Sequence, residues 1–151
     1  MMWTQKEASL LKDLQSQEML CVEKYNRYAD NARDPELKQL FAQIAQAEQQ
    51  HHQLISQMIG GAMPQPQQKQ QQPSPNPPPV NHVPQTGDKE HDAYLCQDAL
   101  DTEKHVSNTY DIAIFEFRAP QARDAPNVVQ GQEQQHGERI YAYMAKNGMV
   151  Q

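Results

Sequence analysis

Glutamate and histidine side chains recur along the sequence at spacings that could bind metal ions. Glu48 and His51 are three residues apart inside a helical pattern, and the same letters, "EQQH", return at 133–136. Residues three apart on a helix lie side by side on one face. Each pair can therefore offer a carboxylate oxygen and an imidazole nitrogen to one ion. One such pair alone is weak evidence, because most of them lie on helix surfaces.

Amphipathic helices would have to position these residues. Thr4 and Glu7 form a T-x-x-E capping box, which predicts the start of one helix. Asp34 followed by Pro35 predicts the N-cap and first residue of another. The apolar periodicity and the Gly60-Gly61 stop signal predict four helices in all, at about 4–29, 34–59, 88–118 and 120–147.

A proline disturbs the fourth expected helix. Pro126 falls in its second turn, shortly before the second Glu-x-x-His pair. Proline cannot donate the helical hydrogen bond and collides with the preceding turn. The helix therefore either kinks at Pro126 or starts late, with Asp124 as its N-cap. Both alternatives are open at the level of the sequence.

The connections between the helices predict the topology. The turns within each pair of helices are very short, whereas residues 60–88 contain the low-complexity run "PQQKQQQPSPNPPPV". A segment of this composition favours extended conformations and can span the length of a bundle. The sequence predicts one domain over 1–151, with a hairpin at 4–59, a linker at 60–88 and a hairpin at 89–147. Two hairpins joined by a long crossover are typical of the all-α ferritin-like four-helix bundle.

The two hairpins also resemble each other. An offset of 85 residues aligns Glu18 with Glu103, Tyr25 with Tyr110, and one "EQQH" with the other. One offset runs through helix, turn and helix, which indicates an internal repeat.

Polar residues interrupt the buried face of each helix at one level. On each expected helix, the residues at heptad spacing form the buried face. These positions run from Leu11 to Tyr28, Leu37 to Met58, Cys96 to Phe117 and Ala122 to Tyr143. They are occupied by apolar residues, cysteines and tyrosines, except at the centre of each helix. In each hairpin the two glutamates are equally distant from the turn, so they reach the same height along the bundle. The central residues are Glu18, Glu48, His51, Glu103, Glu133 and His136.

These six residues form the candidate metal site. Four carboxylates in an apolar core repel one another, so they must either take up protons or surround cations. The set is that of ferritin-like di-iron and di-manganese proteins. Oxygen and nitrogen donors suit iron or manganese, and zinc would also bind. The alternative is a hydrogen-bonded cluster without metal. His52, His91 and His105 lie off the buried faces or at their ends, and we expect them and His82 to be surface residues.

Composition and charge exclude other classes of function. The net charge is −6, and basic residues do not cluster, which argues against a nucleic-acid partner. No apolar run is long enough to span a membrane, and the first residues lack the apolar core of a secretory signal. Cys21 and Cys96 fall within helical patterns, and we expect buried, reduced thiols in a protein made in the cytoplasm.

A family resemblance adds to these inferences. The second hairpin, from "YLCQDALDTEKHVSNTYDIAIFEFRAP" to "YAYMAKNGM", resembles the spore coat protein F family of endospore-forming bacteria. The first, "LCVEKYNRYADNARDPELKQLFAQIAQAEQQHHQLISQMIGG", is similar to a shorter form of the same unit. The resemblance implies a ferritin-like bundle, synthesis in the sporulating cell and deposition in or near the spore coat. It also implies a structural role, with other coat proteins or further copies of the chain as partners.

Two functions of different class follow. The first is a structural spore coat protein whose bundle carries a potential two-metal site, and whose linker acts as a tether, a substrate for glutamine–lysine cross-linking or a spacer. The alternative is a di-iron or di-manganese oxidoreductase acting on oxygen, peroxide or ferrous iron. The chain has no Ser/His/Asp or Cys/His arrangement and no glycine-rich phosphate loop to suggest other catalysis.

Overall fold

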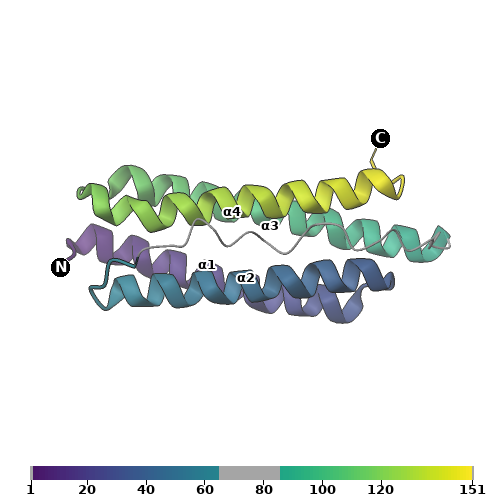
Figure 1. Ribbon diagram of the computed structural model, residues 1–151, viewed down its shortest axis with the longest axis horizontal. Helices are drawn as coiled ribbons and strands as arrows, with labels where there is room; N and C mark the ends of the chain where they lie inside the picture. The colour runs from purple at the N-terminus through teal and green to yellow at the C-terminus, as the bar shows by residue number, and fades with distance from the viewer. Residues whose placement is uncertain (1, 65–85, 151) are drawn as a thin grey trace.

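Four α-helices make up almost all of the described chain. The computed structural model describes residues 2–64 and 86–150 (Figure 1). The helices in this part are α1 (Gln5–Asn31), α2 (Pro35–Ile59), α3 (Thr86–Glu116) and α4 (Pro120–Lys146). The expected all-α four-helix bundle is therefore confirmed. The glutamine run at 66–73 and His82 lie outside the described residues.

The capping signals in the sequence act as expected. The Thr4 side chain accepts a hydrogen bond from the Glu7 backbone, and the Glu7 carboxylate accepts one from the Thr4 backbone. The Asp34 side chain caps α2, and Pro35 is its first residue. One boundary differs, because α3 begins at Thr86 and the last residues of the predicted linker are already helical.

Pro126 lies inside a continuous helix. Helix α4 begins at Pro120 with Ala119 as its N-cap, so the late start at Asp124 is wrong. Pro126 is buried. It has no backbone N–H to donate to the Ala122 carbonyl oxygen, so this one helical hydrogen bond is missing. The helix nevertheless continues past the proline to the second Glu-x-x-His pair.

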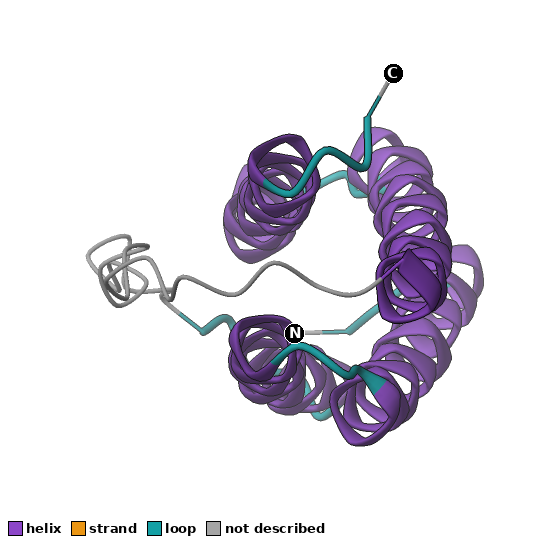
Figure 2. Ribbon diagram, turned by 90° about the vertical axis from the view of Figure 1, so that its right-hand side faces the viewer, coloured by secondary structure: helices purple, strands orange, loops and turns teal. Residues whose placement is uncertain are grey.

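The helices pair as two antiparallel hairpins, α1 with α2 and α3 with α4 (Figure 1). The end of α2 and the start of α3 lie at opposite ends of the bundle, which is the connectivity of a long crossover (Figure 1). Viewed end-on, α1 also packs against α3, whereas α2 and α4 approach each other less closely (Figure 2). Membership of the ferritin-like superfamily stays a prediction, with which this arrangement agrees.

Buried carboxylates fasten each hairpin to the turn of the other. Asp92 on α3 accepts hydrogen bonds from the backbone N–H groups of Arg33 and Asp34, each at 2.9 Å. Glu7 on α1 accepts one from the backbone N–H of Arg118 at 3.1 Å. Asp92 and Glu7 are related by the same 85-residue offset as the two turns. The internal repeat itself stays a prediction.

The predicted core positions are buried throughout. The apolar residues at the expected core positions, from Leu11 to Tyr143, lie in one core that runs the length of the bundle. Tyr25, Tyr28 and Phe41 form an aromatic cluster with ring centroids 5.2 to 5.9 Å apart. Cys21 and Cys96 are buried free thiols. Among the helices described, none has the length and apolar character needed to cross a bilayer.

Candidate metal centre

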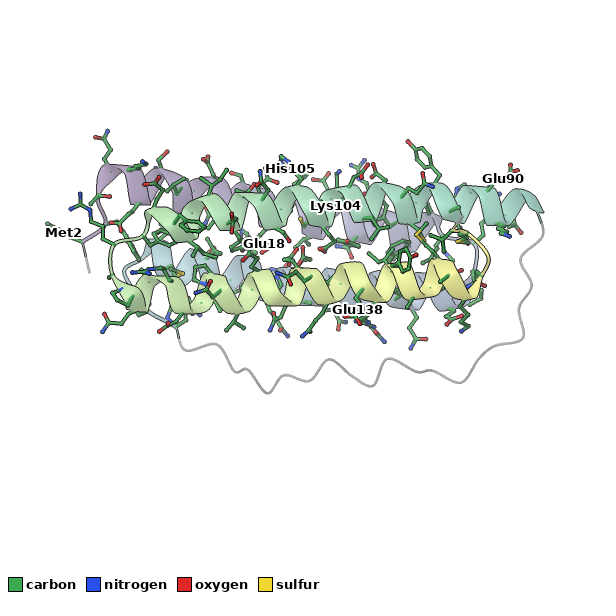
Figure 3. The ribbon with its side chains drawn as sticks, turned by 90° about the horizontal axis from the view of Figure 1, so that it is seen from above. Met2, Glu18, Glu90, Lys104, His105 and Glu138 are labelled. Atoms are coloured by element: carbon green, nitrogen blue, oxygen red, sulfur yellow. The ribbon has the colours of Figure 1, made fainter. Side chains whose placement is uncertain are left out.

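The six predicted residues converge in the middle of the core. Glu18, Glu48, Glu133 and His136 are fully buried, and His51 and Glu103 are 3 % exposed. Figure 3 shows Glu18 inside the bundle, whereas His105 lies at its outer surface. The predicted convergence is thus observed. Their role as metal ligands stays a prediction.

Three carboxylates surround His51 and form one set of four donors with it. Its ring nitrogen Nδ1 lies 2.8 Å from Glu48 Oε1, 2.8 Å from Glu133 Oε1 and 3.4 Å from Glu18 Oε2. We call Glu18, Glu48, His51 and Glu133 the His51 group. One donor atom from each residue lies within 4.8 Å of the others. These side chains come from α1, α2 and α4.

A second set surrounds His136. Its Nδ1 lies 3.2 Å from Glu103 Oε1, 3.6 Å from Glu48 Oε1 and 3.8 Å from Glu133 Oε1. We call Glu48, Glu103, Glu133 and His136 the His136 group, which meets the same 4.8 Å limit. It draws on α2, α3 and α4. The two histidine rings are 5.9 Å apart and nearly parallel.

Glu48 and Glu133 belong to both groups. Two ligand atoms of one first-row ion stand roughly 3 Å apart when each bond is about 2.1 Å long. The distances around His51 match this spacing, and those around His136 are slightly longer. The arrangement therefore fits two neighbouring cations that share two carboxylates, with one further Glu and one His for each.

Several of these buried atoms lack a hydrogen-bond partner among the described residues. They are Glu18 Oε1, both carboxylate oxygens of Glu48 and of Glu133, Glu103 Oε2, His51 Nδ1 and His136 Nε2. His51 Nδ1 is 2.8 Å from two carboxylate oxygens but is not aligned for a hydrogen bond with either. Unsatisfied buried polar atoms are rare in folded proteins, and their concentration here fits ions as the missing partners.

Protons can replace the ions in part. Burial raises the pKa of Glu18 to about 7, with the charge of Glu48 adding to the rise. Burial beside Glu48 and Glu103 raises the pKa of Glu133 well above its usual range. For Glu48, burial alone would raise the pKa, but the neighbouring Glu133 carboxyl and His51 imidazole lower it to about 2. The lowered pKa favours the ionised form of Glu48, and the raised pKa favours the protonated form of Glu133 when no metal is present.

The imidazole of His51 takes part in the same balance. Burial would lower its pKa, but the neighbouring Glu18 and Glu48 carboxylates raise it well above the usual value. A protonated His51 beside ionised Glu48 partly neutralises the metal-free cluster. A metal ion would have to displace these protons, as in protein sites where binding releases them.

Two polar residues contact the site although the sequence did not indicate them as its neighbours. The Tyr110 hydroxyl donates a hydrogen bond to Glu18 Oε2 at 2.6 Å. The His51 Nε2 atom lies 2.5 Å from Gln132 Oε1. Tyr110 is fully buried with its hydroxyl satisfied, but no pattern in the sequence indicated Glu18 as its partner. Gln132 gave no signal, because a glutamine in a helix is usually a solvated residue.

The remaining histidines lie apart from the two donor groups. His105 is exposed, as expected, and lies 3.4 Å from the Gln17 side chain. His91 is partly buried and contacts the neighbouring Asp92 carboxylate at 3.2 Å. His52 is also partly buried and does not belong to either group. Discarding His52 as a ligand agrees with this geometry.

Comparison with known proteins identifies the second hairpin. The family model of the Coat F domain matches residues 91–151, which cover most of α3 and all of α4. Residues 91–151 are a Coat F domain. The resemblance to the spore coat protein F family is confirmed over this part of the chain. No curated protein and no solved structure matches the chain.

The match to the Coat F domain supports a spore coat-type protein. The domain contributes Glu103, Glu133 and His136 to the core cluster. The other three candidate ligands come from α1 and α2, which lie outside the matched residues. Each donor group therefore combines residues of the Coat F domain with residues of the first hairpin.

Proposed function

We propose that the protein is a structural component of the spore coat whose bundle binds two metal ions at its centre. The single observation that carries the metal site is the sharing of Glu48 and Glu133 by two buried donor groups. The ions would be held by Glu18 and His51 on one side, Glu103 and His136 on the other, and the two shared carboxylates. Iron and manganese suit these oxygen and nitrogen donors, and zinc is the third choice.

The burial of the cluster supports this proposal. Isolated carboxylates in an apolar core cost several kcal/mol each unless they are paired or coordinate cations. Glu48 and Glu133 each have both oxygens without a hydrogen-bond partner among the residues described. When bound, a pair of such ions supplies Lewis-acid or redox chemistry toward small oxygen species. In the structural role the protein uses the ions to join its hairpins.

Metal analysis tests the site. The full chain is purified without chelator, loaded with Fe²⁺ or Mn²⁺, freed of excess metal and analysed for bound metal per chain. We expect about two ions per chain, as the two donor groups imply. Glu133→Gln should lower this number, whereas Glu138→Gln, which changes an exposed carboxylate on the same helix, should leave it unchanged. Wild-type protein with less than about a tenth of an ion per chain would overturn the metal site.

The coat role has a separate test. We propose that the chain is made in the sporulating cell and deposited in the coat, where it contacts other coat proteins or further copies of itself. The Coat F domain supports this placement. A tagged full chain should appear in the coat fraction of purified spores. A tag that remains in the soluble fraction of the mother cell after coat assembly would contradict the proposal.

Oxidoreductase activity is the second candidate function. It is favoured by the two shared carboxylates, which would keep two ions close together, and by the apolar residues that exclude water from them. Metal-loaded protein should then consume peroxide, oxygen or ferrous iron faster than the Glu133→Gln variant. Equal rates for the two proteins would remove this candidate and leave the structural role.

A further inference from the structure

The two donor groups differ in the residues that support them. In the His51 group, the Gln132 side-chain oxygen lies 2.5 Å from His51 Nε2, and the Tyr110 hydroxyl lies 2.6 Å from Glu18 Oε2. The Gln132 oxygen can only accept, so Nε2 carries a hydrogen, and Nδ1 is the nitrogen that can bind an ion once its own proton is released. His51 and Glu18, which belong to this group alone, are thus each held by a hydrogen bond with a residue that is not itself a donor of the group.

The His136 group lacks these supports. The 85-residue offset pairs Gln132 with Ala47, which has no polar side-chain atom. It pairs Tyr110 with Tyr25, whose hydroxyl donates to the Ala99 carbonyl oxygen at 3.5 Å rather than to a carboxylate. Within the described chain, His136 Nε2 and Glu103 Oε2 have no hydrogen-bond partner.

Outer hydrogen bonds of this kind fix the tautomer and orientation of a metal-binding histidine. Their loss typically lowers metal affinity by about 10- to 100-fold. The distances within the groups point the same way: His51 Nδ1 lies 2.8 Å from each shared carboxylate, and His136 Nδ1 lies 3.6 and 3.8 Å from them. The His51 group is therefore closer to the geometry of a bound ion before any ion arrives.

We infer that the two metal positions are inequivalent, with Gln132 and Tyr110 acting as positioning residues that make the His51 group the tighter and first-filled position. This inference rests on the proposed two-metal site and adds an order of loading to it. The His136 group fills second, at higher metal concentration, because binding must first orient His136 and Glu103. Over a range of concentrations the protein then holds one ion, in the His51 group.

Calorimetric titration of the metal-free full chain with Mn²⁺ tests the order. We expect one tight ion followed by one that binds about 10-fold more weakly or worse. Tyr110→Phe and Gln132→Ala should each weaken the tight ion by about 10- to 100-fold. Tyr25→Phe removes the same hydroxyl from the counterpart tyrosine and should leave the tight ion unchanged. Gln134→Ala, at an exposed position of α4, is the control for Gln132→Ala.

The outcomes separate the two proposals. Two ions of equal affinity in the wild type, or equal effects of Tyr25→Phe and Tyr110→Phe on the tight ion, would overturn the loading order and leave the metal site standing. Absence of Mn²⁺ binding in every protein would overturn the metal site itself. Thermal unfolding in chelator shows that each variant is folded, and Tyr110→Phe keeps the shape of a fully buried side chain.

Discussion

Glu48 and Glu133 have the same functional group but opposite protonation in the metal-free cluster. Glu48 is held ionised by its contacts with Glu133 and His51, whereas burial keeps Glu133 protonated. At pH 7 a raised carboxyl pKa opposes folding, because the unfolded chain releases the proton, and a lowered pKa favours it. The two glutamates therefore contribute to stability with opposite sign.

Replacing each with glutamine should reveal this difference. In chelator at pH 7, Glu133→Gln should raise the midpoint of thermal unfolding, because glutamine stays neutral in both states. Glu48→Gln should lower the midpoint, with a loss of about 3–5 kcal/mol in the free energy of unfolding, because the partner charge is left buried and unpaired. Both should reduce stabilisation by added metal. The same sign of change for the two variants without metal would contradict the assignment, and Glu138→Gln serves as the control.

Glu18 should make the metal-free protein less stable as the pH rises from about 4.5 to about 7. Its pKa is about 7 in the folded chain against a usual 4.5, so the folded state binds more protons in this window. The whole shift corresponds to about 3 kcal/mol at roughly 1.4 kcal/mol per pKa unit. Glu48 does not oppose the trend, since its pKa of about 2 lies below the window.

Urea unfolding in chelator at pH 5 and pH 7 measures this dependence. The free energy of unfolding should fall between the two values in the wild type and fall less in Glu18→Gln. Asp13→Asn, an exposed change on the same helix, should behave like the wild type. Stability that rises with pH in this interval, to the same degree in wild type and Glu18→Gln, would refute the raised pKa.

The helices place these residues through signals that the sequence displays. The capping box at Thr4, the Asp34-Pro35 start and the apolar periodicity are local patterns, and they predict the helices and the six central residues. The features that the sequence did not predict, the roles of Asp92 and Gln132, depend on contacts between the two hairpins. Asp92 was not recognised as a cap, because the N–H groups it accepts belong to a turn in the other hairpin. Gln132 was missed for the same reason, since its partner is on another helix.

The cap at Asp92 should contribute strongly to hairpin packing. Asp92→Ala would leave the backbone N–H groups of Arg33 and Asp34 without their acceptor. We expect a loss of about 2–4 kcal/mol in the free energy of unfolding, because unsatisfied buried donors cost about 1–3 kcal/mol each. Asp88→Ala removes a surface ion pair with Arg33 and should cost less than about 1 kcal/mol. Equal losses in urea unfolding would contradict the cap.

The 85-residue offset between hairpins also predicts a stabilising change at the second metal position. Ala47→Gln would place on α2 the residue that supports His51 from α4. We expect Mn²⁺ to bind more tightly at the His136 group, by up to about 10-fold, because the new side chain can accept from His136 Nε2. Calorimetry should show a smaller difference between the affinities of the first and second Mn²⁺ ions. If the second ion binds as weakly as in the wild type, residue 47 does not support His136 as Gln132 supports His51.

In the whole molecule, the proposed metal site would join the two hairpins at mid-length. Each donor group contains residues from three helices and from both hairpins. The caps at Glu7 and Asp92 hold the ends of the bundle, and the aromatic and aliphatic layers fill the space between. Buried carboxyl groups without hydrogen-bond partners meet at the middle of the bundle, so we expect this level to be the least stable part of the metal-free protein.

Metal binding should therefore stabilise the entire bundle in one transition. An ion at about 100 times its dissociation constant adds roughly 2.7 kcal/mol. For a chain of this size, that amounts to a rise of roughly 5–10 °C in the unfolding midpoint. Chelator should reverse the rise, and Glu138→Gln should retain it. The first hairpin supplies Glu18, Glu48 and His51, so amides of α1 and α2 should gain hydrogen-exchange protection together with those of α3 and α4. Protection limited to the Coat F domain would show that the ions do not join the hairpins.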